Sequence, residues 1–228
     1  MDSAERWLDK TLGYRFKDVR LLQQALTHRS APGSSNERLE FLGDAVLDIV
    51  VSEELYHSLP GAPEGDLSRL RAALVRDTSL AGIAADLGIG EQLILGSGER
   101  KTGGHRRQSI LADALEALFG AVYLDSDFET AADLIRRVFG DKLDDLPHAD
   151  DLRDPKTRLQ EWLQARGATP PEYDLVTVTG KAHQQHFEVS CTVPGHEPAP
   201  GEGRSRRAAE QKAARRMLAM LTAEKGDD

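Results

Sequence analysis

The feature that most constrains this chain is a set of three carboxylates, Glu37, Glu40 and Asp44, spaced by three and then four residues. At roughly 100° per residue, a helix places these side chains within about 60° of one another. The apolar side chains of the same stretch fall on the opposite side, as in a helix that packs against a core. They are Leu39, Leu42, Val46, Ile49 and Val50. The stretch therefore predicts an amphipathic helix with an acidic face.

We expect this helix to begin at Asn36, whose side chain suits an N-cap position, and to extend to about His57. Gly43 lies in its middle, where glycine costs about 1 kcal/mol relative to alanine. Such a glycine indicates that another backbone approaches closely. Phe41 points away from the apolar positions, which favours contact with a second subunit. Burial under the chain's own loops is the alternative.

A second patterned helix, around residues 109–122, carries Asp113 and Glu116 on one face and apolar residues on the other. A solvated face is the ordinary interpretation of either acidic stripe. However, only Arg38 interrupts the first one. Carboxylates within about 4 Å repel by about 4 kcal/mol per pair at an effective dielectric constant near 20, so two facing stripes would need a cation. Hard oxygen ligands with room for water favour Mg²⁺ or Mn²⁺ over zinc.

These two segments also carry a family resemblance. Residues 36–47 (NERLEFLGDAVL) resemble the signature of bacterial ribonuclease III, and residues 109–118 (SILADALEAL) resemble the second catalytic segment of that family. The resemblance implies a homodimeric endonuclease that cleaves double-stranded RNA with Mg²⁺, or with Mn²⁺ in its place, and without an organic cofactor. It implies 5′-phosphate and 3′-hydroxyl ends, and processing of ribosomal RNA precursors and messenger RNA.

The resemblance also assigns roles to individual residues. The implied metal ligands are Glu40, Asp44, Asp113 and Glu116, and the implied catalytic residues are Asp44, Glu116, Glu37 and Glu64. Glu64 is equally well explained as an acid that stabilises the first turn of a helix. Phe41 would insert into the partner subunit. His28, at the end of a short helix, is interpreted as a packed and hydrogen-bonded residue of the scaffold.

The C-terminal part resembles a double-stranded-RNA-binding domain at two places, residues 154–161 (DPKTRLQE) and 203–214 (GRSRRAAEQKAA). The resemblance implies RNA contacts from Thr157, Gln160, Glu161, Gln164, His183, Arg206 and Arg207. Ala208 departs from the pattern because a third basic residue is common there, and Pro200 weakens the third predicted strand. The alternating pattern of residues 187–193 makes Cys191 a core residue.

We therefore expect an all-α endonuclease domain followed by a small α+β domain of α-β-β-β-α order. The predicted boundaries are 1–146 for the catalytic domain, 147–153 for a linker and 154–223 for the RNA-binding domain. The glycine-rich, basic stretch 96–107 is predicted to be a mobile loop in which Arg106 and Arg107 contact phosphates. A merely solvated loop is the alternative.

Charge and composition limit the remaining choices. The formal net charge is −9, which argues against a polyanionic partner, but basic residues cluster at 100–107 and 204–216, away from the acidic helices. The single cysteine excludes an intrachain disulfide. An acidic start and the absence of a long apolar run predict a cytoplasmic protein that does not contact the membrane.

Two other functions fit parts of the sequence. A non-catalytic regulator that binds duplex RNA would need a degenerate ligand position, and all four ligand positions are acidic. A helical, metal-dependent phosphohydrolase acting on nucleotides is opposed by the C-terminal module and by the lack of a His-Asp pair. Duplex cleavage is the function that we predict.

Overall fold

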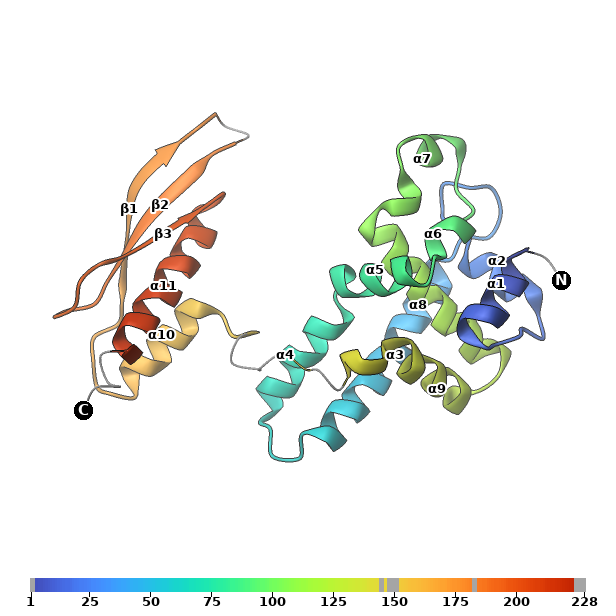
Figure 1. The fold of residues 1–228 in the computed structure, drawn as a ribbon, viewed down its shortest axis with the longest axis horizontal. Helices are drawn as coiled ribbons and strands as arrows, with labels where there is room; N and C mark the ends of the chain where they lie inside the picture. The colour runs from blue at the N-terminus through green and yellow to red at the C-terminus, as the bar shows by residue number, and fades with distance from the viewer. Residues whose placement is uncertain (1–2, 144–145, 147–151, 182–183, 224–228) are drawn as a thin grey trace. The chain divides into compact units, whose positions relative to one another are not determined.

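The computed structural model describes residues 3–143, 146, 152–181 and 184–223 (Figure 1). These residues form two compact units, one up to Leu152 and the other from Arg153 onward. Most of the predicted linker, residues 147–151, lies outside the described residues. Within the described ranges, no helix is sufficiently long and apolar to span a membrane.

The first unit is entirely helical, as predicted. It contains α1 (Ser3–Leu12), α2 (Val19–Ala25), α3 (Glu37–Ser58), α4 (Glu64–Val75), α5 (Asp77–Asp86), α6 (Ile89–Gln92), α7 (Ser97–Lys101), η1 (Gly104–Arg106), α8 (Gln108–Asp125), α9 (Phe128–Phe139) and η2 (Gly140–Lys142). Helix α8 lies among the others (Figure 1). Most of its residues from Ile110 to Val122 are buried. A helix that is apolar around most of its circumference must be covered on all sides, so α8 is the centre of the core.

The prediction of a mobile loop at residues 96–107 was wrong, because this stretch contains α7 and η1. Two of its four glycines permit tight packing. A Cβ atom built on Gly96 would lie 2.2 Å from the carbonyl oxygen of Ser30, and one on Gly104 would lie 2.6 Å from Cγ of Glu99. Gly96 therefore allows close packing against the segment of Ser30, and Gly104 allows it within the stretch itself.

Helix α3 differs from its sequence prediction at two residues. Ile49 was expected on the core side but is exposed. The apolar side of α3 is instead completed by Leu47 and Val51, which are fully buried. Asn36 precedes the helix, but its side chain makes no capping hydrogen bond; its backbone oxygen accepts from the amides of Leu39 and Glu40. The helix start is therefore set by backbone geometry.

Helices α3 and α8 cross at a pair of glycines. A Cβ atom on Gly43 would lie 1.8 Å from the carbonyl oxygen of Glu116, and one on Gly120 would lie 2.3 Å from that of Leu39. Real Cβ atoms do not approach a backbone atom so closely. The predicted close approach at Gly43 is thus confirmed, and it brings the acidic stripes of the two helices side by side.

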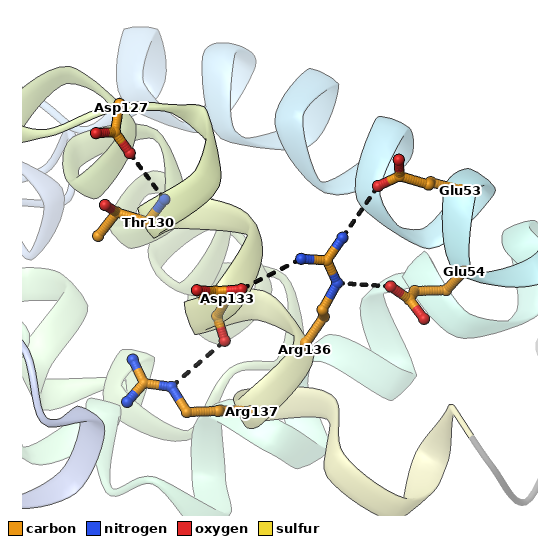
Figure 2. Close-up of polar contacts among 7 residues, drawn as sticks. All are labelled: Glu53, Glu54, Asp127, Thr130, Asp133, Arg136 and Arg137. Carbon is orange, nitrogen blue, oxygen red and sulfur yellow. Dashed lines mark hydrogen bonds and ion pairs between the residues drawn. The ribbon is translucent and has the colours of Figure 1, made fainter.

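Helix α9 is tied to the other end of α3 by one arginine (Figure 2). Arg136 donates from Nε to Glu54 at 2.5 Å and from a terminal nitrogen to Glu53 at 3.0 Å. It also reaches Asp133 on its own helix at 3.3 Å. At the start of α9, the carboxylate of Asp127 accepts from the amide of Thr130. The contact of Arg136 with Glu54 is part-buried and the others are exposed, and together the contacts of Arg136 link α9 to the C-terminal half of α3.

The second unit has the predicted α-β-β-β-α order. It contains α10 (Pro155–Gln164), β1 (Glu172–Thr179), β2 (His186–Thr192), β3 (Ala199–Gly203) and α11 (Arg206–Ala223). The antiparallel sheet has the order β1-β2-β3. Pro200 lies opposite Ser190 on the edge strand, where its missing amide hydrogen is tolerated. Cys191 is fully buried against α10 and α11, as expected for a core residue.

The crossing of α3 and α8 gives a test of stability. We expect Gly43→Ala to lower the free energy of unfolding by about 3 kcal/mol or more, because the methyl group forces the two backbones apart. Gly82→Ala is the matched control, since Gly82 is also inside a helix but nothing lies within 4 Å of its built Cβ atom. The control should be neutral or stabilising by up to about 1 kcal/mol. Urea unfolding measures both, and equal stabilities would contradict the packing argument.

Candidate metal centre and RNA-binding surface

A group of carboxylates forms where α3 and α8 cross. One oxygen from each of Glu40, Asp113 and Glu116 lies within 4.8 Å of the other two. All three side chains are half-buried. Asp44, one turn further along α3, is close enough to Glu116 to raise the pKa of that residue. The structure thus brings together three of the four acidic residues that the resemblance implies as metal ligands, and the fourth, Asp44, is exposed beside them.

The pKa values of all four carboxyl groups are raised. Burial, followed by repulsion from Asp44, Glu40 and Asp113, raises the pKa of Glu116 to about 8. Burial is also the largest cause of the raised pKa values of Glu40, Asp44 and Asp113. Each shift means that the protein disfavours the charged form when no cation is present.

The donor set fits a hard divalent cation. The ligand atoms are carboxylate oxygens, and the group of described residues that could hold an ion includes neither histidine nor cysteine. Such donors suit magnesium or manganese better than zinc. A bound cation would favour the charged forms of these carboxylates, which burial and repulsion disfavour.

Glu37 and Glu64 lie outside the group of three. Glu37 accepts a hydrogen bond from Ser35 and approaches Arg29 at 3.7 Å. Its charge contributes to the raised pKa of Glu40. Glu64 is the first residue of α4 and accepts from Ser68 at 2.7 Å. Within the part of the chain that the structure describes, Glu64 is not part of the carboxylate group, so its catalytic role stays a prediction.

A cavity of about 550 Å³ adjoins the carboxylates. Glu37, Glu40 and Asp113 line it together with His28, Arg29 and Ser30, a segment that the sequence assigned to the scaffold. The other lining residues are Asn36, Glu99, Arg107, Ser109 and Ile110. Asn36 is only 2% exposed, and its Nδ2 has no hydrogen-bond partner among the described residues. A buried donor in this state costs about 1–3 kcal/mol. The cavity volume of about 550 Å³ is within the range typical of ligand sites.

Sequence reasoning missed three ionisable neighbours of the site. Repulsion from Asp77, the first residue of α5, contributes to the raised pKa values of Asp113 and Glu116. Arg29 acts in the opposite direction on Asp113, as would a protonated His28. None of these residues shares a helix with the carboxylates, so no spacing rule could have identified them. In the sequence, these residues are marked only by their position at an end of a predicted helix.

The predicted RNA contacts of the second unit lie on exposed parts of α10 and α11. Thr157, Gln160, Glu161 and Gln164 are all exposed on α10. Arg206 and Arg207 open α11 and are exposed too. His183 lies outside the described residues. In the first unit, Arg106 and Arg107 are exposed near the cavity, and Arg107 pairs with Glu99 at 2.7 Å.

Acidic residues hold the cations of the second unit in place. Glu210 accepts from Lys156 at 2.6 Å and from Arg206 at 2.9 Å. These hydrogen bonds, with that of Lys156 the largest cause, lower the pKa of Glu210 although its burial opposes the shift. Asp154 caps α10 and lies 3.9 Å from Arg207. The basic end of α11 is therefore braced against the start of α10.

The first unit is helical and has a carboxylate group that suits divalent cations. The second unit has a basic helix start, at α11, that acidic residues hold in place. These two features together are those of a metal-dependent nuclease. Two family models match the chain: "Ribonuclease-III-like" over residues 18–143 and "Double-stranded RNA binding motif" over residues 155–221. Ribonuclease 3 of Methylococcus capsulatus is 56% identical over 97% of each chain. Ribonuclease 3 of Nitrosococcus oceani is 52% identical over 99% of this chain and 98% of its own.

A solved structure agrees with these matches. The nuclease domain of ribonuclease III from Campylobacter jejuni is 49% identical, with a TM-score of 0.58, and the match covers 60% of this chain and 95% of that domain. The chain therefore belongs to the ribonuclease III family of endoribonucleases, whose members are metal-dependent, and it carries a double-stranded-RNA-binding domain.

The raised pKa of Glu116 gives a prediction about stability. Between its ordinary pKa of 4.5 and about 8, the folded protein keeps a proton that the unfolded chain releases, so stability falls as pH rises through this window. At pH 8 in a chelator, we expect Glu116→Gln to raise the free energy of unfolding by about 1–2 kcal/mol, a value reduced for partial solvent screening. At pH 4.5 the two proteins should be equally stable.

Urea unfolding at both pH values, with Glu129→Gln as an exposed acidic control on α9, measures this difference. Added Mg²⁺ should stabilise the wild type and the control more than Glu116→Gln, because the variant lacks one anionic ligand. A pH-independent difference would contradict the electrostatic argument, and equal stabilisation by Mg²⁺ would contradict the metal site.

Proposed function

We propose that this chain is a homodimeric, magnesium-dependent endoribonuclease that cleaves both strands of double-stranded RNA and leaves 5′-phosphate and 3′-hydroxyl ends. The observation that carries the proposal is the carboxylate group of Glu40, Asp113 and Glu116, formed by two helices of a chain that also has a duplex-RNA-binding domain. A non-catalytic regulator would not need half-buried carboxylates that repel one another.

In this proposal, Glu40, Asp44, Asp113 and Glu116 hold two Mg²⁺ ions, for which Mn²⁺ can substitute. Bound there, the ions supply a water molecule of lowered pKa and positive charge beside the leaving oxygen. Asp44 and Glu116 would act on the phosphate through the ions that they bind, and Glu37 would support or position that group. Glu64 takes part in positioning the cleavage site.

The second unit supplies shape recognition. Thr157, Gln160, Glu161 and Gln164 would contact ribose hydroxyl groups in one minor groove, and His183 would enter the next. Arg206 and Arg207 would contact the phosphates between them. A domain of this kind spans about 16 base pairs and recognises A-form geometry rather than base order. We place the enzyme in the cytoplasm, acting on structured ribosomal RNA precursors and messenger RNA.

Cleavage tests the proposal directly. We expect Glu116→Gln to reduce the rate of duplex cleavage in Mg²⁺ by more than about 100-fold, because the loss of one ligand weakens metal binding and charge stabilisation together. Binding of the duplex should change little. Gel analysis of duplex RNA, single-stranded RNA and a free nucleotide distinguishes the proposed function from its rivals.

Glu129→Gln is the control for that assay and should cleave as the wild type does. Full cleavage by Glu116→Gln would remove the metal assignment. Binding of duplex without cleavage by the wild type would favour the regulator, and hydrolysis of the nucleotide alone would favour the phosphohydrolase.

A second subunit is supported by an exposed apolar stripe on α3. Phe41 is 79% exposed, and Ile49 and Tyr56 are exposed within about 80° of it on the helix. The matched Campylobacter jejuni nuclease domain is described as flexible in a region involved in dimer formation. We propose that Phe41 inserts into a partner copy of this chain, so that each subunit cleaves one strand.

Replacement of Phe41 tests the dimer. We expect Phe41→Glu to weaken self-association by at least about 30-fold, the effect of losing an aromatic residue at the centre of an interface. Val176→Glu is the control, since Val176 is an exposed apolar residue of the second unit. Sedimentation equilibrium measures both variants. A Phe41→Glu protein that remains a dimer at the wild-type affinity would exclude this stripe as the interface.

A further inference from the structure

The cavity beside the carboxylates is lined by both acidic and basic side chains. Glu40 and Asp113 belong to the proposed metal centre, whereas Arg29 and Arg107 bring positive charge to the same cavity. Each arginine has an acidic partner there: Arg107 pairs with Glu99 at 2.7 Å, and Arg29 approaches Glu37. The ion pair of Arg29 with Glu37 is long, at 3.7 Å, and both side chains are more than half exposed. Such a pair contributes little, so Arg29 can exchange its partner for another anion.

The hydrogen bonds of His28 determine which ring nitrogen carries a proton. The backbone amide of Ser30 donates to Nδ1 at 3.2 Å, so Nδ1 acts as an acceptor. The Ser30 hydroxyl accepts from the amide of Gly96 at 3.0 Å and lies 2.8 Å from Nδ1, which fits a hydroxyl that donates to the ring. The proton therefore resides on Nε2. His28 lines the cavity as a hydrogen-bond donor.

The wall that carries these residues is fixed by backbone hydrogen bonds. The amide of His28 donates to Ile94 at 3.0 Å, and the amide of Ile94 donates to Leu26 at 2.8 Å. The amide of Asn36 donates to Thr27 at 2.9 Å. Asn36 also lines the cavity with a buried side-chain donor that has no partner within the described part of the chain. This cavity is a preorganised set of donors rather than a chance gap between loops.

We propose that this cavity is a backbone subsite for the RNA strand that is cut: it holds the phosphodiester next to the scissile one through Nε2 of His28 and the guanidinium groups of Arg29 and Arg107. The proposal rests on the proposed function, because the metal centre defines where the scissile phosphate lies. The donors and cations that line the adjoining cavity suit a neighbouring phosphate, which would replace Glu37 and Glu99 as the partner of the two arginines. Binding at the subsite would align the strand so that the scissile phosphate lies at the metal centre.

A phosphate modification tests the subsite without altering the protein. One neutral methylphosphonate linkage is placed in turn at each position on either side of the cleavage site of a short duplex. We expect a modification at one linkage adjoining the scissile bond to slow single-turnover cleavage by the wild type by about 10- to 100-fold, the effect of losing a charged hydrogen-bond partner. The protein is unchanged, so a folding defect cannot produce this result.

Protein variants then locate the contact. Arg29→Ala and Arg107→Ala should each slow cleavage of the unmodified duplex by about 10-fold or more. They should lose little further rate on the modified duplex, since both changes remove the same interaction. Arg15→Ala is the matched control: the side chains of Arg15 and Arg29 are both 72% exposed, and Arg15 pairs with Asp9 outside this cavity. The control should respond to the modification as the wild type does.

His28 offers a pair of variants with opposite expectations. Glutamine can place an amide near the position of Nε2, so His28→Gln should keep the cleavage rate within about threefold of the wild type. Asparagine reaches only the position of Nδ1, so His28→Asn should keep the contact with Ser30 and lose about 10-fold in rate. Duplex affinity measured without divalent ions is a second readout, and we expect at most a threefold change because the other unit contributes contacts.

The outcomes separate the subsite from the proposed function. If the wild type does not cleave unmodified duplex at all, the proposed function fails. If it cleaves, but no methylphosphonate adjoining the cut slows it, the subsite is wrong while the nuclease stands. Additive losses for Arg29→Ala and the modification would also overturn the subsite, as would equal rates for the two His28 variants.

Discussion

The packing of α3 against α8 at Gly43 and Gly120 is the contact on which the rest of the first unit depends. Neither position has room for a side chain, since built Cβ atoms would fall 1.8 and 2.3 Å from carbonyl oxygens of the opposite helix. At this separation, carboxylates one turn away on each helix come within reach of one another. The acidic site is therefore a consequence of backbone proximity, and the buried core around α8 holds that proximity against charge repulsion.

This arrangement stores an electrostatic cost that a cation can relieve. Burial raises the pKa of Glu116 to about 8, and burial likewise raises the pKa values of Glu40 and Asp113. A protein under no functional constraint would avoid such a group, because apolar residues at the same crossing would pack without repulsion. The core around the site compensates, since α8 is buried along most of its length. The stability lost at the site is what a bound divalent ion would restore.

Sequence patterns predicted the helices, the strands and the acidic group at the crossing of α3 and α8, because helical spacing and family motifs are local. The patterns failed where tertiary contacts determine whether a residue is buried or a segment is helical. Ile49 has the spacing of a core residue but is exposed, and the stretch 96–107 contains helices although its glycines resemble a loop. The cavity wall at His28 and Arg29 was assigned to the scaffold, since its place beside Asp113 depends on a backbone contact with Ile94, 66 positions from His28.

An acidic protein can bind a polyanion when its cations are locally ordered. Glu210 is the clearest case, with a side chain only 13% exposed, whereas the Arg206 side chain that it holds is 58% exposed. The buried carboxylate limits the conformations of Lys156 and Arg206 without covering the guanidinium. Ordering lowers the entropy that phosphate binding would cost, even though the acid reduces the net charge. Affinity for RNA therefore depends on where the cations are fixed, and a formal charge of −9 does not oppose it.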